Sequence, residues 1–524
     1  MRSLRRRATA SLALLATVAV AACTADGTDA GGTGGDGAAS PRTLRVLASS
    51  ELADMEPVLE EARKATGVTV KPTYVGTLDA VEQIASGDAE KAYDAVWLSS
   101  NDYLRLRPDT AKKITGETPV MTSPVALGIR PAALTRLGWD PAKVTWSQIH
   151  QAVAEKKLGY GMTDPARSNS GFSALVSIAS GLSGAQSALT EKDVAAATPK
   201  LKEFFGGQKL TSGSSGWLAT AWSRRTDVDA LINYESVLLN SPEKLTVVRP
   251  ADGVVTADYP FTLLTSASAD AKQAAARLTA HLRTPTAQRM ITNRTLRRPV
   301  VPGVELAEPL TADQRRELPF PGSRAVADGL LDAYENKLRR PSRTVYVLDT
   351  SGSMAGDRLS RLRSALAELT GDFRDRETVT LMPFGSSVKR NEVRTYTVDP
   401  AAPEKAIEAM RAQASGLTAS GGTAIYSSLK EAYSQLGSGT GDDTFTSIVL
   451  MTDGENTDGD PAGAFDAFFR SQSPAQQRTP VFPILFGDSD RAELDHIATL
   501  TGGRLFDANK GSLDGAFEEI RGYQ

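Results

Sequence analysis

The stretch Asp349-Thr350-Ser351-Gly352-Ser353 directly follows an apolar run at residues 343–348, and this junction strongly constrains the fold of the C-terminal part of the chain. The run is short and rich in β-branched and aromatic residues, which predicts a buried strand. Asp349, Ser351 and Ser353 then alternate on a turn that Gly352 allows to bend. We therefore expect one carboxylate and two hydroxyl oxygens close together, a set of hard ligands that suits Mg²⁺.

Two later segments extend this set of ligands. Gly421-Gly422-Thr423 precedes a helical pattern at 424–436, so Thr423 offers a third hydroxyl. A β-rich run at 446–451 ends in Thr452-Asp453-Gly454-Glu455, so Asp453 offers a second carboxylate. The remaining pattern indicates an open, doubly wound α/β sheet, with strands at 378–384, 393–398, 481–486 and 504–506 and helices between them.

Residues 343–524 resemble the von Willebrand factor type A (VWA) domain, and all five positions of its metal-ion-dependent adhesion site (MIDAS) are present. The resemblance implies a Rossmann-like fold that binds Mg²⁺ or another divalent cation. It implies that Ser351, Ser353 and Thr423 contact the metal directly or through water, and that Asp349 and Asp453 act mostly through water. An Asp or Glu carboxylate of a partner protein would take the open coordination position. The alternative is that the motif only caps the fold and holds water.

A second alternation of strand and helix patterns occupies residues 43–305. Strands are expected at 44–48, 68–74 and 95–98, and helices at 53–65 and 78–86, which indicates βαβ units and a parallel sheet. Hydroxyl-rich segments follow the strands, where ligands of such sheets bind. Residues 164–171 precede an apolar helical stretch, whose first N–H groups can hold an anion.

The segments TLRVLASSEL, YDAVWLSSNDYL, DPARSNSGFSAL and INYESVLLN resemble, in this order, type II bacterial extracellular solute-binding proteins. The resemblance implies a bilobal periplasmic-binding-protein-like module whose two α/β lobes close on a ligand by hinge motion. We place two crossings between the lobes, near residues 123–128 and 259–264. The candidate cleft residues are Ser49, Ser50, Ser99, Ser123, Ser168, Asn169, Ser170, Tyr234 and Glu235.

Each cleft residue has a structural alternative. A Ser or Asn before a helix commonly caps it, and Tyr234 and Glu235 can be a buried phenol and a solvated acid at a strand end. Trp97 and Trp146 are expected to pack in the core. Trp217 and Trp222 stand in a Gly/Ser-rich neighbourhood, so packing and ligand stacking both stay open. No feature identifies the class of solute.

The N-terminus predicts export. Residues 1–22 resemble a secretory signal peptide, because basic residues precede an apolar run too short to span a bilayer. Val20-Ala21-Ala22-Cys23 resembles the bacterial lipobox, which implies cleavage before Cys23 and lipidation of its thiol. Residues 23–42 are Gly-rich and are expected to form a flexible tether. We therefore expect a lipid anchor on the extracytoplasmic side of the cell membrane; the alternative is a soluble secreted protein.

Residues 306–342 are expected to form a linker and a helix at 324–337, because Pro309, Pro319 and Pro321 interrupt any longer helix. This linker separates the solute-binding-like module from the VWA-like module.

Composition excludes several classes of protein. The formal charge is −3, and the 55 basic and 62 acidic residues that follow residue 22 give −7, which excludes a generally basic protein that coats nucleic acid. The single Cys rules out an intramolecular disulfide, and three His are too few for a multi-His metal site. Nucleophile-elbow and zinc-helix motifs are missing from the sequence, so we do not expect an enzyme.

These features predict a cell-surface lipoprotein that binds a partner protein through a Mg-dependent adhesion site and a solute or other ligand in an interlobe cleft. The alternative is a substrate-binding receptor of an ABC-type uptake system with an accessory VWA domain. No nucleic-acid partner is expected.

Overall fold

The computed structural model describes residues 42–523 except 214, 371–372, 438–443 and 510–512. The predicted signal peptide, Cys23 and the tether up to residue 41 lie outside the described residues. Among the described residues, no helix has the length and apolar character needed to cross a bilayer.

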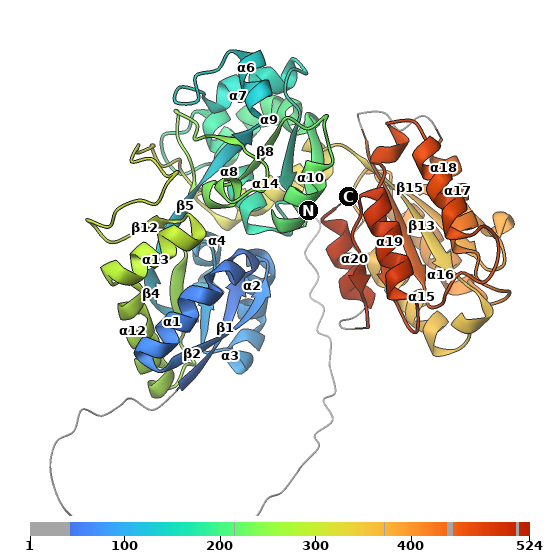
Figure 1. Ribbon diagram of the computed structural model, residues 1–524, viewed down its shortest axis with the longest axis horizontal. Helices are drawn as coiled ribbons and strands as arrows, with labels where there is room; N and C mark the ends of the chain where they lie inside the picture. Colours follow the sequence, from blue (N-terminus) through green and yellow to red (C-terminus); the bar gives the residue numbers. More distant parts are fainter. Residues whose placement is uncertain (1–41, 214, 371–372, 438–443, 510–512, 524) are drawn as a thin grey trace, which may run out of the picture. The chain divides into compact units, whose positions relative to one another are not determined.

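The first lobe of the N-terminal module is a five-stranded sheet in the order β2-β1-β3-β11-β4 (Figure 1). β1, β2 and β3 are parallel, as the βαβ pattern predicted, and β11 runs antiparallel to β3 and β4. The strands are β1 (Arg42–Ser49), β2 (Val68–Val75), β3 (Ala95–Trp97), β4 (Ile114–Pro119) and β11 (Pro260–Leu264). The helices are η1 (Ser50–Met55), α1 (Glu56–Thr66), α2 (Thr77–Ser86), α3 (Asp88–Ala92), α4 (Asp102–Arg105), α5 (Pro108–Ala111), α12 (Ala269–Leu282) and α13 (Pro285–Thr295).

The second lobe is built on a sheet in the order β10-β5-β8-β6-β7, with β9 and β12 also paired to β5. Its strands are β5 (Met121–Ile129), β6 (Tyr160–Thr163), β7 (Gln208–Ser212), β8 (Ala230–Tyr234), β9 (Thr246–Val248), β10 (Thr256–Ala257) and β12 (Arg298–Pro299). Its helices are α6 (Pro131–Leu137), α7 (Trp146–Ala154), α8 (Asn169–Ser183), α9 (Glu191–Gly206), α10 (Ser215–Ser223) and α11 (Glu235–Leu239). The module therefore has the two α/β lobes that the sequence predicted.

The chain crosses between the lobes at positions that differ from the prediction. The crossing expected at 123–128 lies at Val120, because β5 begins at Met121 and already belongs to the second sheet. The crossing expected at 259–264 lies at its first residue, where Asp258 and Tyr259 join β10 to β11. A third crossing follows α13, because β12 pairs with β5. Short strands of two residues give too little sequence pattern to predict it.

The segment predicted as a linker lies against the second lobe. Arg249 donates from Nη1 to the carbonyl of Asp313 at 2.7 Å, and the rings of Phe320 and Phe172 meet edge to face. α14 (Arg324–Ala333) and the π-helical turn Tyr334–Leu338 follow, and Tyr334 is buried against Phe205 of α9. The prolines therefore prevent a long regular helix in this segment, but the segment packs against the second lobe and is not a free linker.

The C-terminal module is a six-stranded sheet in the order β15-β14-β13-β16-β17-β18, parallel except for β15. Its strands are β13 (Ser342–Asp349), β14 (Thr378–Phe384), β15 (Arg394–Thr397), β16 (Phe445–Thr452), β17 (Val481–Leu485) and β18 (Phe506–Asp507). Its helices are α15 (Asp357–Leu369), α16 (Pro403–Gly416), α17 (Ile425–Leu436), α18 (Ala462–Ser471), α19 (Arg491–Thr501) and α20 (Leu513–Arg521), with 3₁₀ turns at Gly352–Met354, Arg390–Glu392 and Gln476–Arg478.

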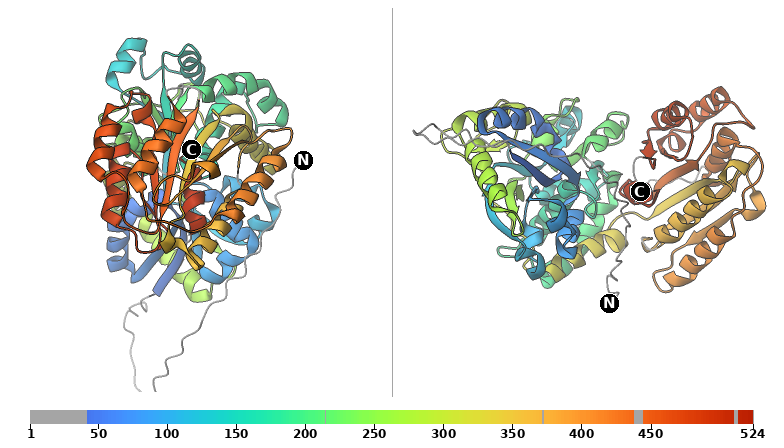
Figure 2. Two further views of the ribbon diagram at one scale, coloured as in Figure 1. Left: turned by 90° about the vertical axis from the view of Figure 1, so that its right-hand side faces the viewer. Right: turned by 90° about the horizontal axis from the view of Figure 1, so that it is seen from below.

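Both faces of this sheet are covered by helices (Figure 2). Tyr346 and Leu348 of β13 share one core with α15, α16 and α20, while Val345 and Val347 share the other with α17, α18 and α19. Because side chains on both faces of β13 are buried, its sequence is a continuous apolar run, as expected of a central parallel strand. The strand order reverses between β13 and β16, and this is the point where doubly wound sheets bind ligands.

Candidate functional sites

The predicted metal-site residues gather at the switch point of the C-terminal sheet. Asp349 ends β13, Asp453 directly follows β16, and Thr423 lies in the loop before α17. The Ser351 and Ser353 hydroxyls are 2.9 Å apart, and Ser353 donates to Oδ1 of Asp453 at 2.9 Å. Four of the five residues are buried, and Ser353 is exposed to solvent. The structure therefore joins the motif of β13 to the motif of β16 through a chain of hydroxyl hydrogen bonds.

Asp349 is held in one orientation by two hydrogen bonds. Its Oδ1 accepts from the backbone N–H of Ser351 at 2.8 Å, and its Oδ2 accepts from the Thr452 hydroxyl at 2.6 Å. Burial raises the pKa of the Asp349 carboxyl, and the two hydrogen bonds act in the opposite direction. Thr452 thus orients Asp349, a role that its sequence position alone did not predict.

Backbone contacts bring the loop of Thr423 to the same place. The N–H of Gly352 donates to the carbonyl of Gly421 at 2.8 Å, which ties this loop to the turn after β13. A Cβ on Gly454 would lie 3.7 Å from Oγ1 of Thr423 and 4.0 Å from Oγ of Ser353. The absence of a side chain at Gly454 therefore leaves open the space that both hydroxyls face.

The chemistry of this donor set fits a hard cation. Two carboxylates and three hydroxyls offer only oxygen, and Mg²⁺ prefers oxygen over nitrogen or sulfur. Within the described part of the chain, no group of three or more His, Cys, Asp or Glu side chains is placed to hold a metal. A cation at this site would therefore depend on the hydroxyls of Ser351, Ser353 and Thr423.

Arg358 is a basic residue at this site that the sequence did not predict. Arg358, in the first turn of α15, donates from Nη1 to Oδ2 of Asp453 at 2.7 Å and from Nη2 to Oδ2 of Asp488 at 2.6 Å. Hydrogen bonds to Asp453 and Asp488 raise the pKa of Arg358. The sequence around Arg358 is that of an ordinary polar helix face, so it does not predict a role for this side chain. Only the fold brings Asp453 and Asp488 close to it.

The candidate cleft residues form a second polar cluster, between the two lobes. The Ser49 hydroxyl at the end of β1 accepts from the backbone N–H of Ser99 at 3.0 Å and from Nδ2 of Asn169 at 2.6 Å. Asn169 begins α8 of the second lobe, so its bond to Ser49 crosses from one lobe to the other. Ser49 makes no capping bond to η1, so capping does not explain this side chain.

Tyr234 lies on the second-lobe side of this cluster. Its hydroxyl lies 2.9 Å from Oγ of Ser173 and donates to the carbonyl of Asn169 at 3.2 Å. Burial raises the pKa of the Tyr234 phenol, and the nearby Glu51 carboxylate adds to this. Ser170 joins a hydroxyl chain with Thr163 and Ser168, and Ser168 does not cap α8.

Three predicted cleft residues take no part in these hydrogen bonds. Ser50 is exposed, and the Ser123 hydroxyl is bound to Ser236 at 3.1 Å. Glu235 is buried and forms ion pairs with Arg298 at 2.7 Å and with Arg249 at 3.4 Å, so it is not the solvated acid that the alternative reading expected.

The region between the lobes also contains Arg297, Asp54 and Tyr259, which the sequence did not predict as candidate site residues. Arg297 is buried, pairs with Asp54 at 2.7 Å, and places its guanidinium carbon 4.9 Å from the centre of the Tyr259 ring. Tyr259 has a positive φ of 41°, which is strained for an aromatic residue, at a crossing between the lobes. Burial and the nearby Asp102 carboxylate raise the pKa of Asp258 to about 6.

The four tryptophans discussed above have distinct surroundings. Trp97, Trp146 and Trp222 are buried, and each indole N–H donates to a backbone carbonyl. They are packing residues. Trp217 is partly buried, and its ring lies 4.6 Å from the Tyr523 ring, so it packs in the structure as well.

Two family models match the chain. Residues 44–294 match the model of a bacterial extracellular solute-binding protein, and residues 344–455 match the von Willebrand factor type A domain. The second match includes all five predicted metal-site positions.

Curated relatives share a limited part of their length with the chain. Inter-alpha-trypsin inhibitor heavy chain H4 of Sus scrofa is 31% identical over 126 residues, or 23% of this chain and 13% of the relative. An uncharacterized protein of Synechocystis is 33% identical over 128 residues, or 24% of this chain and 29% of the relative. The chain thus spans less than a third of the length of these relatives.

Solved structures resemble each module separately. The periplasmic binding protein AfuA from Actinobacillus pleuropneumoniae, with fructose-6-phosphate bound, is 13% identical; the match covers 57% of this chain and 99% of that chain, with a TM-score of 0.46. A von Willebrand factor type A protein from Catenulispora acidiphila is 18% identical. The match covers 35% of this chain and 42% of that chain, with a TM-score of 0.30.

Proposed function

Because the chain joins an extracellular solute-binding domain at residues 44–294 to a VWA domain at residues 344–455, we propose that it is a non-enzymatic, lipid-anchored surface protein that binds a partner protein through Mg²⁺. The observation that carries this proposal is the hydrogen-bonded chain from Ser351 through Ser353 to Asp453, with Asp349 fixed beside it. Ser351, Ser353, Thr423, Asp349 and Asp453 would hold the cation. When bound, Mg²⁺ supplies a Lewis-acidic position for a partner's Asp or Glu carboxylate.

The experiment that tests this proposal is a titration of the full chain with MgCl₂ by isothermal calorimetry, followed by capture of envelope proteins with and without EDTA. We expect one Mg²⁺ per chain and a captured protein that EDTA releases. A chain that binds no Mg²⁺ would overturn the proposal. Lipidation is tested separately, since Cys23→Ser should shift the protein from the membrane fraction to the soluble fraction.

Replacing Arg358 with Gln is expected to tighten Mg²⁺ binding about tenfold. The Arg358 guanidinium lies 2.7 Å from the Asp453 carboxylate, so it neutralises a charge that would attract the cation. The same calorimetric titration measures the effect, and Arg390→Gln, an exposed arginine paired with Glu431, is the matched control. Unchanged or weaker Mg²⁺ binding in Arg358→Gln would mean that Arg358 orients Asp453 and does not oppose the metal.

A second candidate function is solute capture for an ABC-type uptake system, with the VWA domain as an accessory. The hydrogen bond between Ser49 and Asn169 favours it, because polar groups of the two lobes meet at 2.6 Å where a solute would be enclosed. The polar contacts of Ser99, Ser173 and Tyr234 would contribute to the same site.

Native mass spectrometry of the protein from its own envelope tests the cleft. We expect an added mass that is lost when Tyr234→Phe is combined with Ser99→Ala, because both hydroxyls belong to the cluster between the lobes. Ser50→Ala is the control, since Ser50 is exposed. Protein that carries metal alone would instead favour a cleft that serves only as a scaffold.

A further inference from the structure

A cavity of about 440 Å³ lies outside both the cleft and the metal site. One wall is lined by residues 209–211, 217, 221 and 224–227 of the second lobe. The other is lined by residues 444–447, 469, 474–475, 477–480, 500–502 and 523 of the VWA module, together with Arg340 just before this module. Its volume falls within the range of pockets that bind small molecules. None of the predicted cleft or metal-site residues lines it, so other side chains determine which ligand it can bind.

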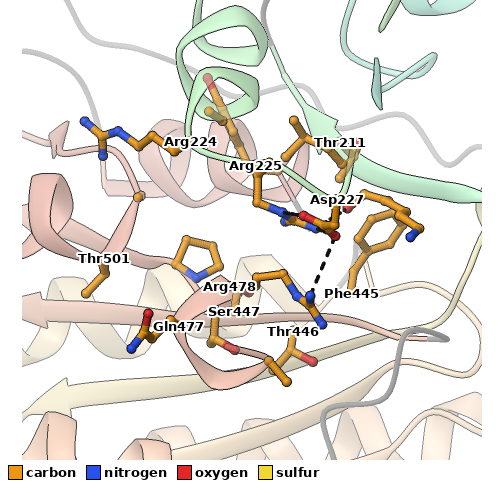
Figure 3. Close-up of a pocket in the computed structure, with 18 of the residues that line it drawn as sticks. Thr211, Arg224, Arg225, Asp227, Phe445, Thr446, Ser447, Gln477, Arg478 and Thr501 are labelled. Atoms are coloured by element: carbon orange, nitrogen blue, oxygen red, sulfur yellow. Dashed lines mark hydrogen bonds and ion pairs between the residues drawn. The ribbon is translucent and has the colours of Figure 1, made fainter. Parts of the chain in front are cut away.

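The described residues of the lining are strongly basic. Lys209, Arg224, Arg225, Arg340 and Arg478 line the cavity, against a single described acid, Asp227. Figure 3 shows that Arg225, Asp227 and Arg478 converge from the two walls. Like charges gathered around a low-dielectric cavity repel one another, and an anion in the cavity would relieve this repulsion.

Asp227 does not balance this charge. It accepts from Nε of Arg225 at 2.8 Å and from Nη2 at 2.9 Å, and its carboxylate is 3.8 Å from Arg478. Burial opposes its ionisation, but these two arginines outweigh burial and lower the pKa of Asp227 to about 2. Asp227 therefore stays charged and is already matched by Arg225. The side-chain ammonium of Lys209 forms no hydrogen bond or ion pair among the described residues, and only its backbone carbonyl accepts from Arg225.

A hydroxyl on the wall points to a ligand independently of the charge. Oγ1 of Thr211 is buried, and it has no hydrogen-bond partner among the residues that the structure describes. Buried hydroxyls are normally paired, and each exception needs an explanation such as a ligand. Leu210, Ala221 and Trp217 add an apolar surface to the same cavity.

We propose that this cavity binds a small organic anion, with a phosphate or carboxylate group near Lys209 and Arg478 and an apolar part against Leu210 and Trp217. Arg478 belongs to the VWA domain and Lys209 to the second lobe. A ligand that contacts both would hold the two domains together, so its binding would couple the domain that binds solute to the domain that binds a partner protein.

Titration of the full chain with inorganic phosphate and, separately, with citrate tests this proposal. EDTA is present throughout, so that no divalent cation at the metal site can recruit the anion. Calorimetry gives the stoichiometry, and quenching of tryptophan fluorescence reports on Trp217. We expect one saturable site; tighter binding of phosphate would assign a phosphorylated ligand, and tighter binding of citrate a carboxylate.

Variants then locate the bound anion. Arg478→Gln and Lys209→Gln are each expected to weaken binding about tenfold, since each removes one charge-assisted contact. Arg470→Gln, an exposed arginine paired with Asp466, should bind as the wild type does. Lys209→Gln keeps the test decisive if Arg478→Gln does not fold. The proposal is wrong if neither anion binds saturably, or if both lining variants bind with wild-type affinity.

Discussion

Asp349→Asn is expected to weaken Mg²⁺ binding by about 100-fold or more while the VWA domain remains folded. Asn can keep a hydrogen bond to each of the two partners of Asp349. Its side-chain carbonyl oxygen can accept from the Ser351 N–H. Its NH₂ group can donate to the Thr452 hydroxyl oxygen, because that hydroxyl can rotate and direct its own proton elsewhere. The substitution removes only the negative charge. Calorimetric titration with MgCl₂ measures the loss, and circular dichroism measures the fold.

The matched control for this substitution is Asp495→Asn, because Asp495 is exposed on α19 and lies outside the metal site. It should bind Mg²⁺ as the wild type does. Wild-type Mg²⁺ affinity in Asp349→Asn would contradict the metal site, and it would remove the basis for Mg-dependent partner binding as well.

Glu377→Gln is expected to destabilise the VWA domain by about 3–5 kcal/mol, because it breaks a buried ion pair from one side. Glu377 is fully buried at the junction before β14, and its Oε2 accepts from Nη2 of Arg521 at 2.7 Å and from the backbone N–H of Arg374 at 3.0 Å. Arg521 is equally buried. Without the carboxylate, the buried Arg521 cation would lose this ion pair. Urea unfolding measures the change.

The same pair predicts a pH dependence. Burial raises the pKa of Glu377, but Arg521 and Arg374 outweigh it and hold the native pKa below the usual 4.5. A carboxylate with a depressed native pKa contributes stability above its unfolded pKa and loses it as pH falls through its native pKa. We therefore expect the wild type to lose stability below pH 4.5 more steeply than Glu377→Gln.

The control for this second substitution is Glu431→Gln, which breaks an exposed ion pair with Arg390 in the same domain. Exposed pairs contribute little to stability, so the midpoint of unfolding should hardly move. Equal effects of Glu377→Gln and Glu431→Gln would show that the buried pair does not stabilise the domain.

That the five candidate metal-site residues gather in one place was predictable, because each lies within a few residues of a strand end or a helix start. The strand that precedes Asp349 is apolar and short, and parallel strands of a doubly wound sheet end at the same edge. Sequence therefore placed Asp349 and Asp453 together without knowledge of any side-chain contact. Arg358 was not predictable, because Asp453 and Asp488 reach it only through the packing of α15 against the ends of β16 and β17.

The structure brings only some of the candidate cleft residues together, for a related reason. Ser49, Asn169 and Tyr234 do form one cluster, but Glu235, the neighbour of Tyr234, pairs with arginines that lie distant in sequence. Adjacent side chains at the end of a strand point in different directions, so proximity in sequence does not place them in one site. Arg297 and Asp54 are 243 positions apart, and no local pattern links them.

The sequence alone determined the two α/β modules, their order and the edge of the sheet where the candidate metal-site residues gather, because periodicity and strand-end motifs are local properties of a chain. Only the tertiary structure decided where residues 306–338 lie, which side chains surround Asp453, and that Lys209 and Arg478 line one cavity. These are long-range contacts, which depend on how helices and sheets pack and leave no periodic signal in the sequence.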